Sequence, residues 1–223
     1  MTIAENILKI KTGIGNARLI AVSKTIPEDK ILEAYNAGQL LFGENKVQEL
    51  VRKRQNLPVD IEWHFIGHLQ TNKVRQISPF VSLIHGVDSL KLLQAIDKEG
   101  KKIGRIIPCL LQFHIAEEET KFGFSYDEAV IMLTSSEFSI ITNVTICGVM
   151  GMATFTENNE QVRKEFRQLK HIFNKLKSDF FGRNSCFSEI SMGMSSDYPI
   201  AVEEGSTLVR IGTSVFGVRN SAR

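Results

Sequence analysis

Two short segments near opposite ends of the chain carry residues suited to binding a phosphorylated carbonyl compound. The apolar residues 19–22 lead to Lys24, and residues 208–211 lead to Gly212 and Thr213. A lysine at the end of a buried strand lies in apolar surroundings, which lower its pKa and let its amine attack an aldehyde. Glycine lets the backbone approach a phosphate oxygen, and threonine offers hydroxyl and amide donors. These segments indicate a cofactor pocket, although Lys24 could instead simply extend its amine into solvent.

An alternation of apolar and amphipathic segments predicts the fold that positions these residues. Strands that alternate with helices pair in parallel. Eight such units in about 200 residues predict an α/β fold, a single (β/α)8 TIM barrel forming one domain over residues 1–223. A doubly wound open sheet is the alternative. The eight β-prone segments are residues 19–22, 40–42, 61–66, 81–84, 105–113, 144–150, 186–191 and 207–211.

Helix start signals occur between these segments. Thr25 with Glu28, and Ser125 with Glu128, have the spacing of a capping box, in which side chains bind the amides of a helix start. The longest amphipathic stretch, residues 156–177, carries one apolar stripe and predicts a helix that packs on the sheet.

In such barrels, the functional residues follow the strands, and phosphate binds at the loops after strands seven and eight. Ser195 follows the seventh segment, and Gly212 and Thr213 follow the eighth, which predicts a phosphate site there. Ser195-Ser196-Asp197 also fits an ordinary helix N-cap. The residues that follow strands are Lys24, residues 44–45, 64–67 and 86–88, His114, and residues 150–152, 192–195 and 210–213.

Composition restricts the partners and the cellular setting. The 27 Lys and Arg against 25 Asp and Glu give a net charge of +2, which provides no broad field for nucleic acid or an anionic membrane, and the basic residues 52–54 are interpreted as a solvated helix face. Cys109, Cys147 and Cys186 lie far apart in apolar runs and are interpreted as reduced core thiols. The first 15 residues contain no uninterrupted apolar stretch, so we expect a cytoplasmic protein without a membrane anchor.

His64 and His68 are four residues apart, a spacing that suits metal ligands on a helix. Residues 61–66 are typical of a strand followed by a glycine break, so the spacing does not indicate a metal site. We expect His64 to form hydrogen bonds at the mouth of the barrel.

The chain resembles the YggS/PROSC family of pyridoxal phosphate (PLP) homeostasis proteins, which are related to the N-terminal barrel of alanine racemase. The resembling segments span nearly the full chain in the expected order. They are Ala21-Val22-Ser23-Lys24, residues 42–49 (FGENKVQE), residues 63–73 (WHFIGHLQTNK), Gly148-Val149-Met150, residues 191–197 (SMGMSSD) and Val209-Arg210-Ile211-Gly212-Thr213.

The resemblance implies that PLP is held as a Schiff base on Lys24. It also implies that Ser195, Gly212 and Thr213 bind the phosphate and that Arg210 faces the pyridine nitrogen. Asn45 is expected to line the same pocket, with His64 and Met192 nearby. One departure occurs after the fifth apolar segment, where the family commonly has Asn but this chain has His114, while Lys121 and Gly123 still match.

Arg210 argues against broad PLP chemistry, because a guanidinium beside the ring nitrogen disfavours the pyridinium form that stores electrons. Racemisation also needs a second acid or base opposite Lys24, which the resemblance places in a C-terminal domain of alanine racemase. We expect that domain to be absent here, since the sequence ends ten residues after Thr213. Tyr35, Tyr126 and Tyr198 fall in helical stretches and do not readily replace it.

The leading hypothesis is therefore a PLP-binding carrier or regulator with little or no enzymatic turnover. It would act as a monomer and serve PLP-dependent recipient enzymes. Two alternatives remain open at the level of sequence. One is a PLP-dependent amino-acid racemase, and the other is a cofactor-free barrel enzyme that acts on a sugar phosphate through Lys24.

Overall fold

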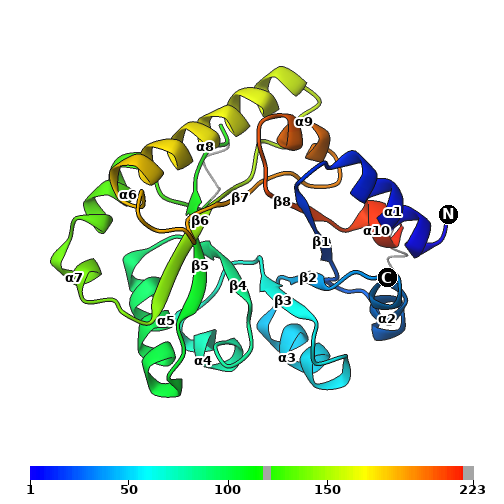
Figure 1. Cartoon of the computed structure of the whole chain (residues 1–223), viewed down its shortest axis with the longest axis horizontal. Coiled ribbons are helices and arrows are strands. Elements are labelled where there is room, and N and C mark those ends of the chain that lie inside the picture. Colours follow the sequence, from blue (N-terminus) through cyan, green and yellow to red (C-terminus); the bar gives the residue numbers. More distant parts are fainter. Residues whose placement is uncertain (118–121, 218–223) are drawn as a thin grey trace.

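Eight parallel strands close into a ring that Figure 1 shows end-on, with the helices packed around it. The structure is a computed structural model that describes residues 1–117 and 122–217. The TIM-barrel prediction is confirmed, the open sheet is excluded, and each of the eight apolar segments overlaps one strand. The strands are β1 (Arg18–Val22), β2 (Leu41–Glu44), β3 (Glu62–Phe65), β4 (Leu83–Val87), β5 (Ile107–Phe113), β6 (Val144–Gly151), β7 (Glu189–Ser191) and β8 (Leu208–Ile211).

The helices follow the strands around the outside of the ring. Ser125 caps α6 with the reciprocal hydrogen bonds of a capping box, as predicted. The long helix begins at Asn159 rather than at residue 156, because the Asn158 side chain accepts the amides of Glu160 and Gln161. The helices are α1 (Ile3–Gly13), α2 (Glu28–Asn36), α3 (Val47–Asn56), the 3-10 turn η1 (Thr71–Lys73), α4 (Val74–Ile77), α5 (Leu90–Ile103), α6 (Tyr126–Leu133), α7 (Ser136–Ser139), α8 (Asn159–Asp179), α9 (Tyr198–Glu203) and α10 (Thr213–Phe216).

The capping box predicted at Thr25 is wrong. Helix α2 starts after Pro27, which has no side-chain cap, and Thr25 has a φ of +64°. Its amide donates to the Glu49 carboxylate of α3 at 2.7 Å rather than to a residue of its own helix. A tertiary contact therefore replaces the local one.

Two apolar layers hold the barrel together. One layer lies between strands and helices and includes the buried stripe of α8, with Phe166 and Leu169 fully buried. The other fills the barrel interior and consists of Ile20, Leu83, Leu110, Met150 and Leu208. Each fully buried side chain of this kind contributes about 1.5–3 kcal/mol, so the two layers give the rim a rigid support.

The ring closes where β1 pairs with β8, with Ile20 opposite Arg210. Just beyond these strands, a side chain at Gly212 would begin 3.2 Å from the Val22 carbonyl oxygen, which is closer than ordinary packing. The carboxyl ends of β1 and β8 therefore leave the barrel side by side, and Lys24 emerges next to Gly212.

Two interpretations of surface and core residues need correction. Lys53, assigned to a solvated helix face, is completely buried, because it continues the inward stripe of Val47 and Leu50 on α3. Cys186, assigned to the core, is exposed, whereas Cys109 is buried and Cys147 is partly buried. Burial raises the pKa of the Cys147 thiol to about 11, which keeps it protonated at neutral pH.

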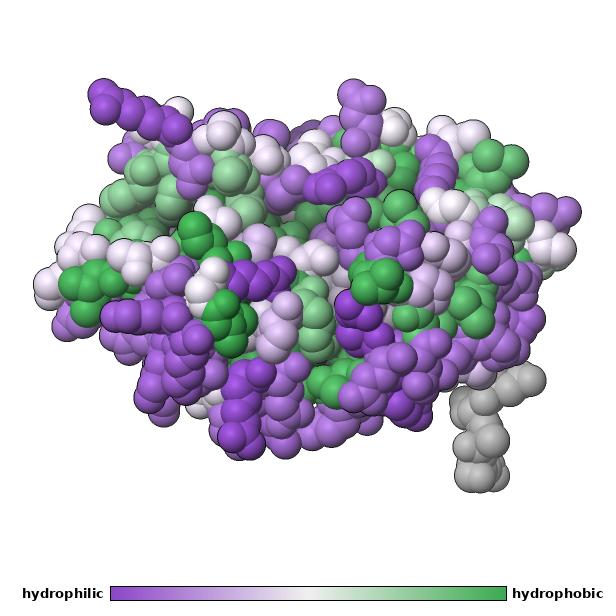
Figure 2. Space-filling model, turned by 60° about the horizontal axis from the view of Figure 1, so that its bottom comes forward, coloured by the Kyte–Doolittle hydropathy of each residue, from purple (hydrophilic) through white to green (hydrophobic). Residues whose placement is uncertain are grey.

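The face of the molecule shown in Figure 2 is mostly hydrophilic. On the side shown in Figure 2, hydrophobic residues form small separate groups among hydrophilic ones. No helix within residues 1–117 and 122–217 is long and apolar enough to cross a membrane.

Candidate functional site

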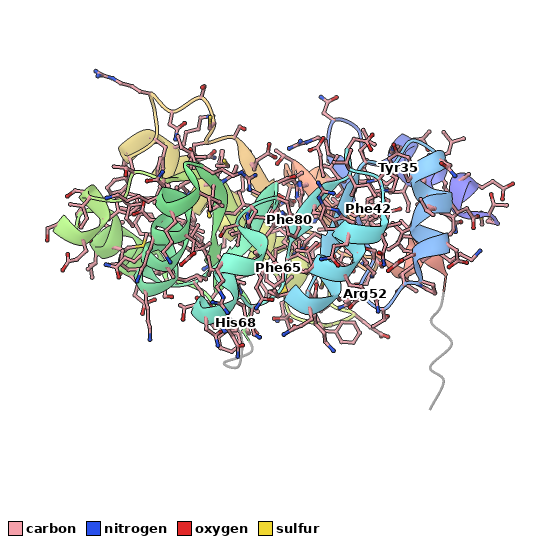
Figure 3. The ribbon with its side chains drawn as sticks, turned by 90° about the horizontal axis from the view of Figure 1, so that it is seen from below. Tyr35, Phe42, Arg52, Phe65, His68 and Phe80 are labelled. Carbon is pink, nitrogen blue, oxygen red and sulfur yellow. The ribbon has the colours of Figure 1, made fainter. Side chains whose placement is uncertain are left out.

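A cavity of about 610 Å³ opens at the mouth formed by the carboxyl ends of the strands. His68 marks this mouth at the lower edge of Figure 3, and Tyr35, at the end of α2, lies at the opposite edge. The cavity is lined by Val22, Lys24, Asn45, Ile66, Met152, Phe155, Met194, Ser195, Ser196, Arg210, Gly212, Thr213 and Ser214. Six of the eight predicted cofactor residues are among them, and His64 and Met192 are not.

The loop after β7 is folded tightly so that Ser195 and Ser196 face the cavity. Asp197 occupies the N-cap position of α9, as the N-cap alternative predicted, but its side chain makes no capping hydrogen bond and its carboxylate accepts the Met194 amide at 2.5 Å instead. Gly193 has a φ of +93°, and a side chain there would lie 2.6 Å from the Ala201 methyl group, so only glycine fits.

The loop after β8 adds a second set of donors. The Gly212 carbonyl accepts the amides of Val215 and Phe216, so α10 begins directly at the cavity wall. Amides in the first turn of a helix have no acceptor within that helix, and this applies to Thr213 and Ser214. Their amides and hydroxyls, together with those of the loop after β7, can hold an anion without a cationic side chain.

Asn45 presents unused hydrogen-bonding capacity to the cavity. Its side-chain oxygen is buried and has no partner among the described residues. Gly67 fixes this segment, since a side chain there would lie only 2.4 Å from the Asn45 carbonyl oxygen. A buried polar atom without a partner is costly, so its retention at a cavity wall indicates a ligand contact.

Arg210 reaches the floor of the cavity from β8. Its guanidinium donates to the Ser191 hydroxyl and, at 3.0 Å, to the Gly151 carbonyl oxygen. Burial lowers the pKa of Arg210 to about 10, although Asp197 acts in the opposite direction. The side chain is therefore a fixed cation at neutral pH.

A chain of hydrogen bonds leads from Arg210 through the barrel interior. Ser191 lies 2.9 Å from the His85 ring, and His85 lies 3.0 Å from Nδ1 of His64. His64 borders a separate cavity of about 310 Å³, which Arg18 and Glu62 also line, at the opposite mouth. Thus His64 belongs to the barrel interior, and no sequence pattern indicated its partner His85.

Burial keeps both histidines neutral. It lowers the pKa of His64 to about 3, with a smaller effect from Arg18, and it also lowers the pKa of His85. If Ser191 accepts from Arg210, its hydroxyl proton is directed to Nδ1 of His85, which places the His85 proton on Nε2, toward His64. The hydrogen bonds through Ser191, His85 and His64 therefore orient Arg210 without adding charge to the barrel interior.

Several other predicted positions can now be placed. Met192 is fully buried, and Met194 takes the place at the cavity wall instead. His68 lies in the loop after β3, where it pairs with Asp88 at 3.2 Å and stacks on Phe122, and no group of three potential metal ligands occurs in the part of the chain that the structure describes. Lys121 lies outside the described residues.

Phe155 and Ser214 line the cavity but lie outside every segment singled out from the sequence. Phe155 is 87% exposed and lies in the loop after β6, where no periodic pattern marks it. Ser214 follows Thr213 in α10 and adds a hydroxyl to the phosphate loop.

Comparisons with known proteins identify the family of this chain. A sequence model described as "Alanine racemase, N-terminal domain" matches residues 1–220. A "Pyridoxal phosphate homeostasis protein" of Aquifex aeolicus is 40% identical over 205 residues, covering 91% of this chain and 87% of its own. A protein of the same name from Mus musculus is 36% identical and covers 92% of this chain and 78% of its own.

Solved structures show the same relationship. PipY of Synechococcus elongatus PCC7942, solved with PLP bound, has a TM-score of 0.87 and 35% identity and covers 97% of this chain and 100% of its own. Alanine racemase from Bartonella henselae, at 15% identity, shares the fold, with a TM-score of 0.75 over 97% of this chain and 58% of its own. The chain therefore belongs to the alanine racemase N-terminal domain family and, within it, to the pyridoxal phosphate homeostasis proteins.

Proposed function

We propose that this chain binds PLP at the cavity of about 610 Å³ and serves in PLP homeostasis as a carrier or regulator. The proposal rests mainly on one observation: Lys24, from the beginning of the chain, lines the same cavity as Ser195 and Thr213, which come from near its end. The relatives' name and the PLP bound to PipY support the choice of ligand.

The residues present fit the cofactor. Lys24 supplies an amine for the aldehyde, and the loops after β7 and β8 supply donors for the phosphate. The buried side-chain oxygen of Asn45 at the same wall has no partner among residues 1–117 and 122–217, and Arg210 offers a cation for the pyridine nitrogen. When bound, PLP would supply an aldehyde that can condense with Lys24 Nζ, with release of water, and a ring that can withdraw electrons.

We further propose little or no turnover. Arg210 is held as a cation by its hydrogen bonds to Ser191 and Gly151, and a cation at the ring nitrogen opposes protonation there. Apart from the Arg210 cation, Lys24 is the one acid or base among the described residues that line the cavity. A two-base racemisation needs a second such group.

We also propose that residues 1–223 form a single PLP-binding domain. A monomeric state, a cytoplasmic location and recipient enzymes stay predictions.

Mixing the purified protein with PLP and with L-alanine tests this function. We expect a visible absorbance band that remains with the protein through gel filtration, and no measurable loss of optical activity from the alanine. Protein that stays colourless would contradict PLP binding. Rapid loss of optical activity would instead favour the racemase alternative.

Thr213→Ala tests the phosphate loop. The variant keeps the amide but loses the hydroxyl, so we expect PLP affinity to fall by about 1.5–3 kcal/mol, the contribution of one hydrogen bond to a charged group. An absorbance titration with PLP measures this change. Thr207→Ala, at the opposite end of β8, is the matched control. Equal PLP affinities of Thr213→Ala and Thr207→Ala would show that the phosphate does not bind at the Thr213 hydroxyl.

A further inference from the structure

A buried ionic cluster lies beneath Lys24. The Lys53 ammonium donates to Glu44 Oε1 at 2.8 Å, to Glu49 Oε1 at 2.7 Å and to the Ser23 carbonyl oxygen at 2.7 Å, so all three of its donors are used. The side chains of Lys53 and Glu44 are completely buried. Removing such charges from water is unfavourable, and apolar residues often replace buried ion pairs without loss of stability. The cluster therefore calls for an explanation other than stability.

The cluster contacts the chain on both sides of Lys24. On one side, Lys53 binds the Ser23 carbonyl oxygen, and the Ser23 hydroxyl donates to Glu44 Oε1 at 2.5 Å. On the other side, the Thr25 amide donates to Glu49 Oε1 at 2.7 Å. These bonds involve ionised groups, which makes them stronger than neutral ones. Lys24 is held between them.

The held segment is an unfavourable turn. The Ile26 amide donates to the Ser23 carbonyl oxygen at 2.9 Å and closes a four-residue turn, with Lys24 and Thr25 as its central residues. Thr25 has a φ of +64° and is the one non-glycine residue with a positive φ in the described ranges. This is the φ pattern of a type II turn, whose third position favours glycine. A β-branched residue there is strained.

The turn also sets the direction of the two side chains. Lys24 lines the 610 Å³ cavity, whereas Thr25 and Glu49 line a separate surface depression of about 560 Å³. A turn that relaxed to an ordinary backbone conformation at Thr25 would change the direction of Lys24. Glu49 can prevent this relaxation because it is held as a carboxylate. Burial raises the pKa of Glu49, but the hydrogen bonds from Lys53 and Thr25 outweigh burial and lower the pKa overall.

We propose that Glu49 and Lys53 are positioning residues that clamp the strained turn and so aim Lys24 at the cavity. The clamp itself is a property of the apo chain, and its role toward PLP rests on the proposed function.

A cycle of variants at Glu49 and Thr25 tests the clamp. Glu49→Ala removes the carboxylate and keeps α3 helical, and we expect PLP affinity to fall about tenfold. Thr25→Gly relieves the strain and should leave affinity within about threefold of the wild type. The double variant should return to within about threefold of Thr25→Gly, because glycine holds the turn without the clamp. Glu33→Ala, which removes an exposed carboxylate from α2, is the matched control.

Hydrogen exchange of the Ile26 amide, measured by NMR without PLP, gives an independent result. Its exchange should accelerate about tenfold in Glu49→Ala, stay unchanged in Glu33→Ala and slow again in the double variant. Unchanged affinity and exchange in Glu49→Ala would overturn the inference, as would a double variant as impaired as Glu49→Ala. If Glu49→Ala does not fold, the PLP affinity of the double variant is compared with that of Thr25→Gly. A tenfold lower affinity in the double variant would overturn the inference. If the exchange of the Ile26 amide responds as expected but the wild type binds no PLP, the proposed function is wrong, while the inference that Glu49 and Lys53 clamp the turn is supported.

Discussion

Lys24→Ala is expected to abolish the visible absorbance band of the PLP complex and to leave the fold intact. Lys24 is half-buried at the end of β1, and we propose its amine as the covalent partner of the aldehyde. Alanine removes that amine, while the phosphate donors at Thr213 and Ser195 remain. The variant should therefore retain only weak, noncovalent binding. Absorbance titration and equilibrium dialysis with PLP measure the two effects separately.

Lys46→Ala is the matched control for this prediction. Lys46 is an exposed lysine at the rim, next to Asn45, and lines the neighbouring surface depression rather than the cavity. We expect this variant to keep the wild-type band and affinity. A band that persists in Lys24→Ala and disappears in Lys46→Ala would reassign the attachment site.

Stability at mildly acidic pH is expected to depend on the histidines inside the barrel. The pKa of His64 is lowered to about 3 in the folded chain by burial, against 6.5 when unfolded. The unfolded chain therefore takes up a proton that the folded chain does not, and stability present above pH 6.5 is lost as the pH falls toward 3. Between pH 8 and pH 5, His64 alone should lower the free energy of unfolding by about 2 kcal/mol. His85, whose pKa is also lowered, adds to this loss.

Urea unfolding of His64→Asn at several pH values tests this expectation. The variant should lose a corresponding part of the pH dependence, whatever its stability at pH 8. His171→Asn, at an exposed position on α8, should keep the wild-type dependence. Identical slopes in His64→Asn and the wild type would mean that His64 takes up protons in the folded chain.

The residues that follow strands were predictable because a parallel barrel brings all strand ends to one mouth. This rule predicted Lys24 and Thr213, and it included the segments of Met152 and Met194. It did not predict the depth of His64, because the depth of a residue in the barrel depends on strand tilt and stagger. Hence His64 was expected at the mouth and lies nearer the other end.

Other features depended on tertiary contacts that a local pattern does not contain. Thr25 and Glu28 have the spacing of a capping box, but Glu49, which is distant in sequence, takes the Thr25 amide. Lys53 was interpreted from its basic neighbours, although its three-residue spacing from Leu50 places it on the buried side of α3. That spacing was the signal that could have revealed the cluster.

Borohydride reduction of the PLP complex, followed by digestion and peptide mass spectrometry, tests the central claim most directly. We expect the peptide containing Lys24 to carry the added mass of the reduced cofactor, with Lys24 as its modified residue. Modification of a different lysine, or a saturated complex with no modified peptide, would contradict it.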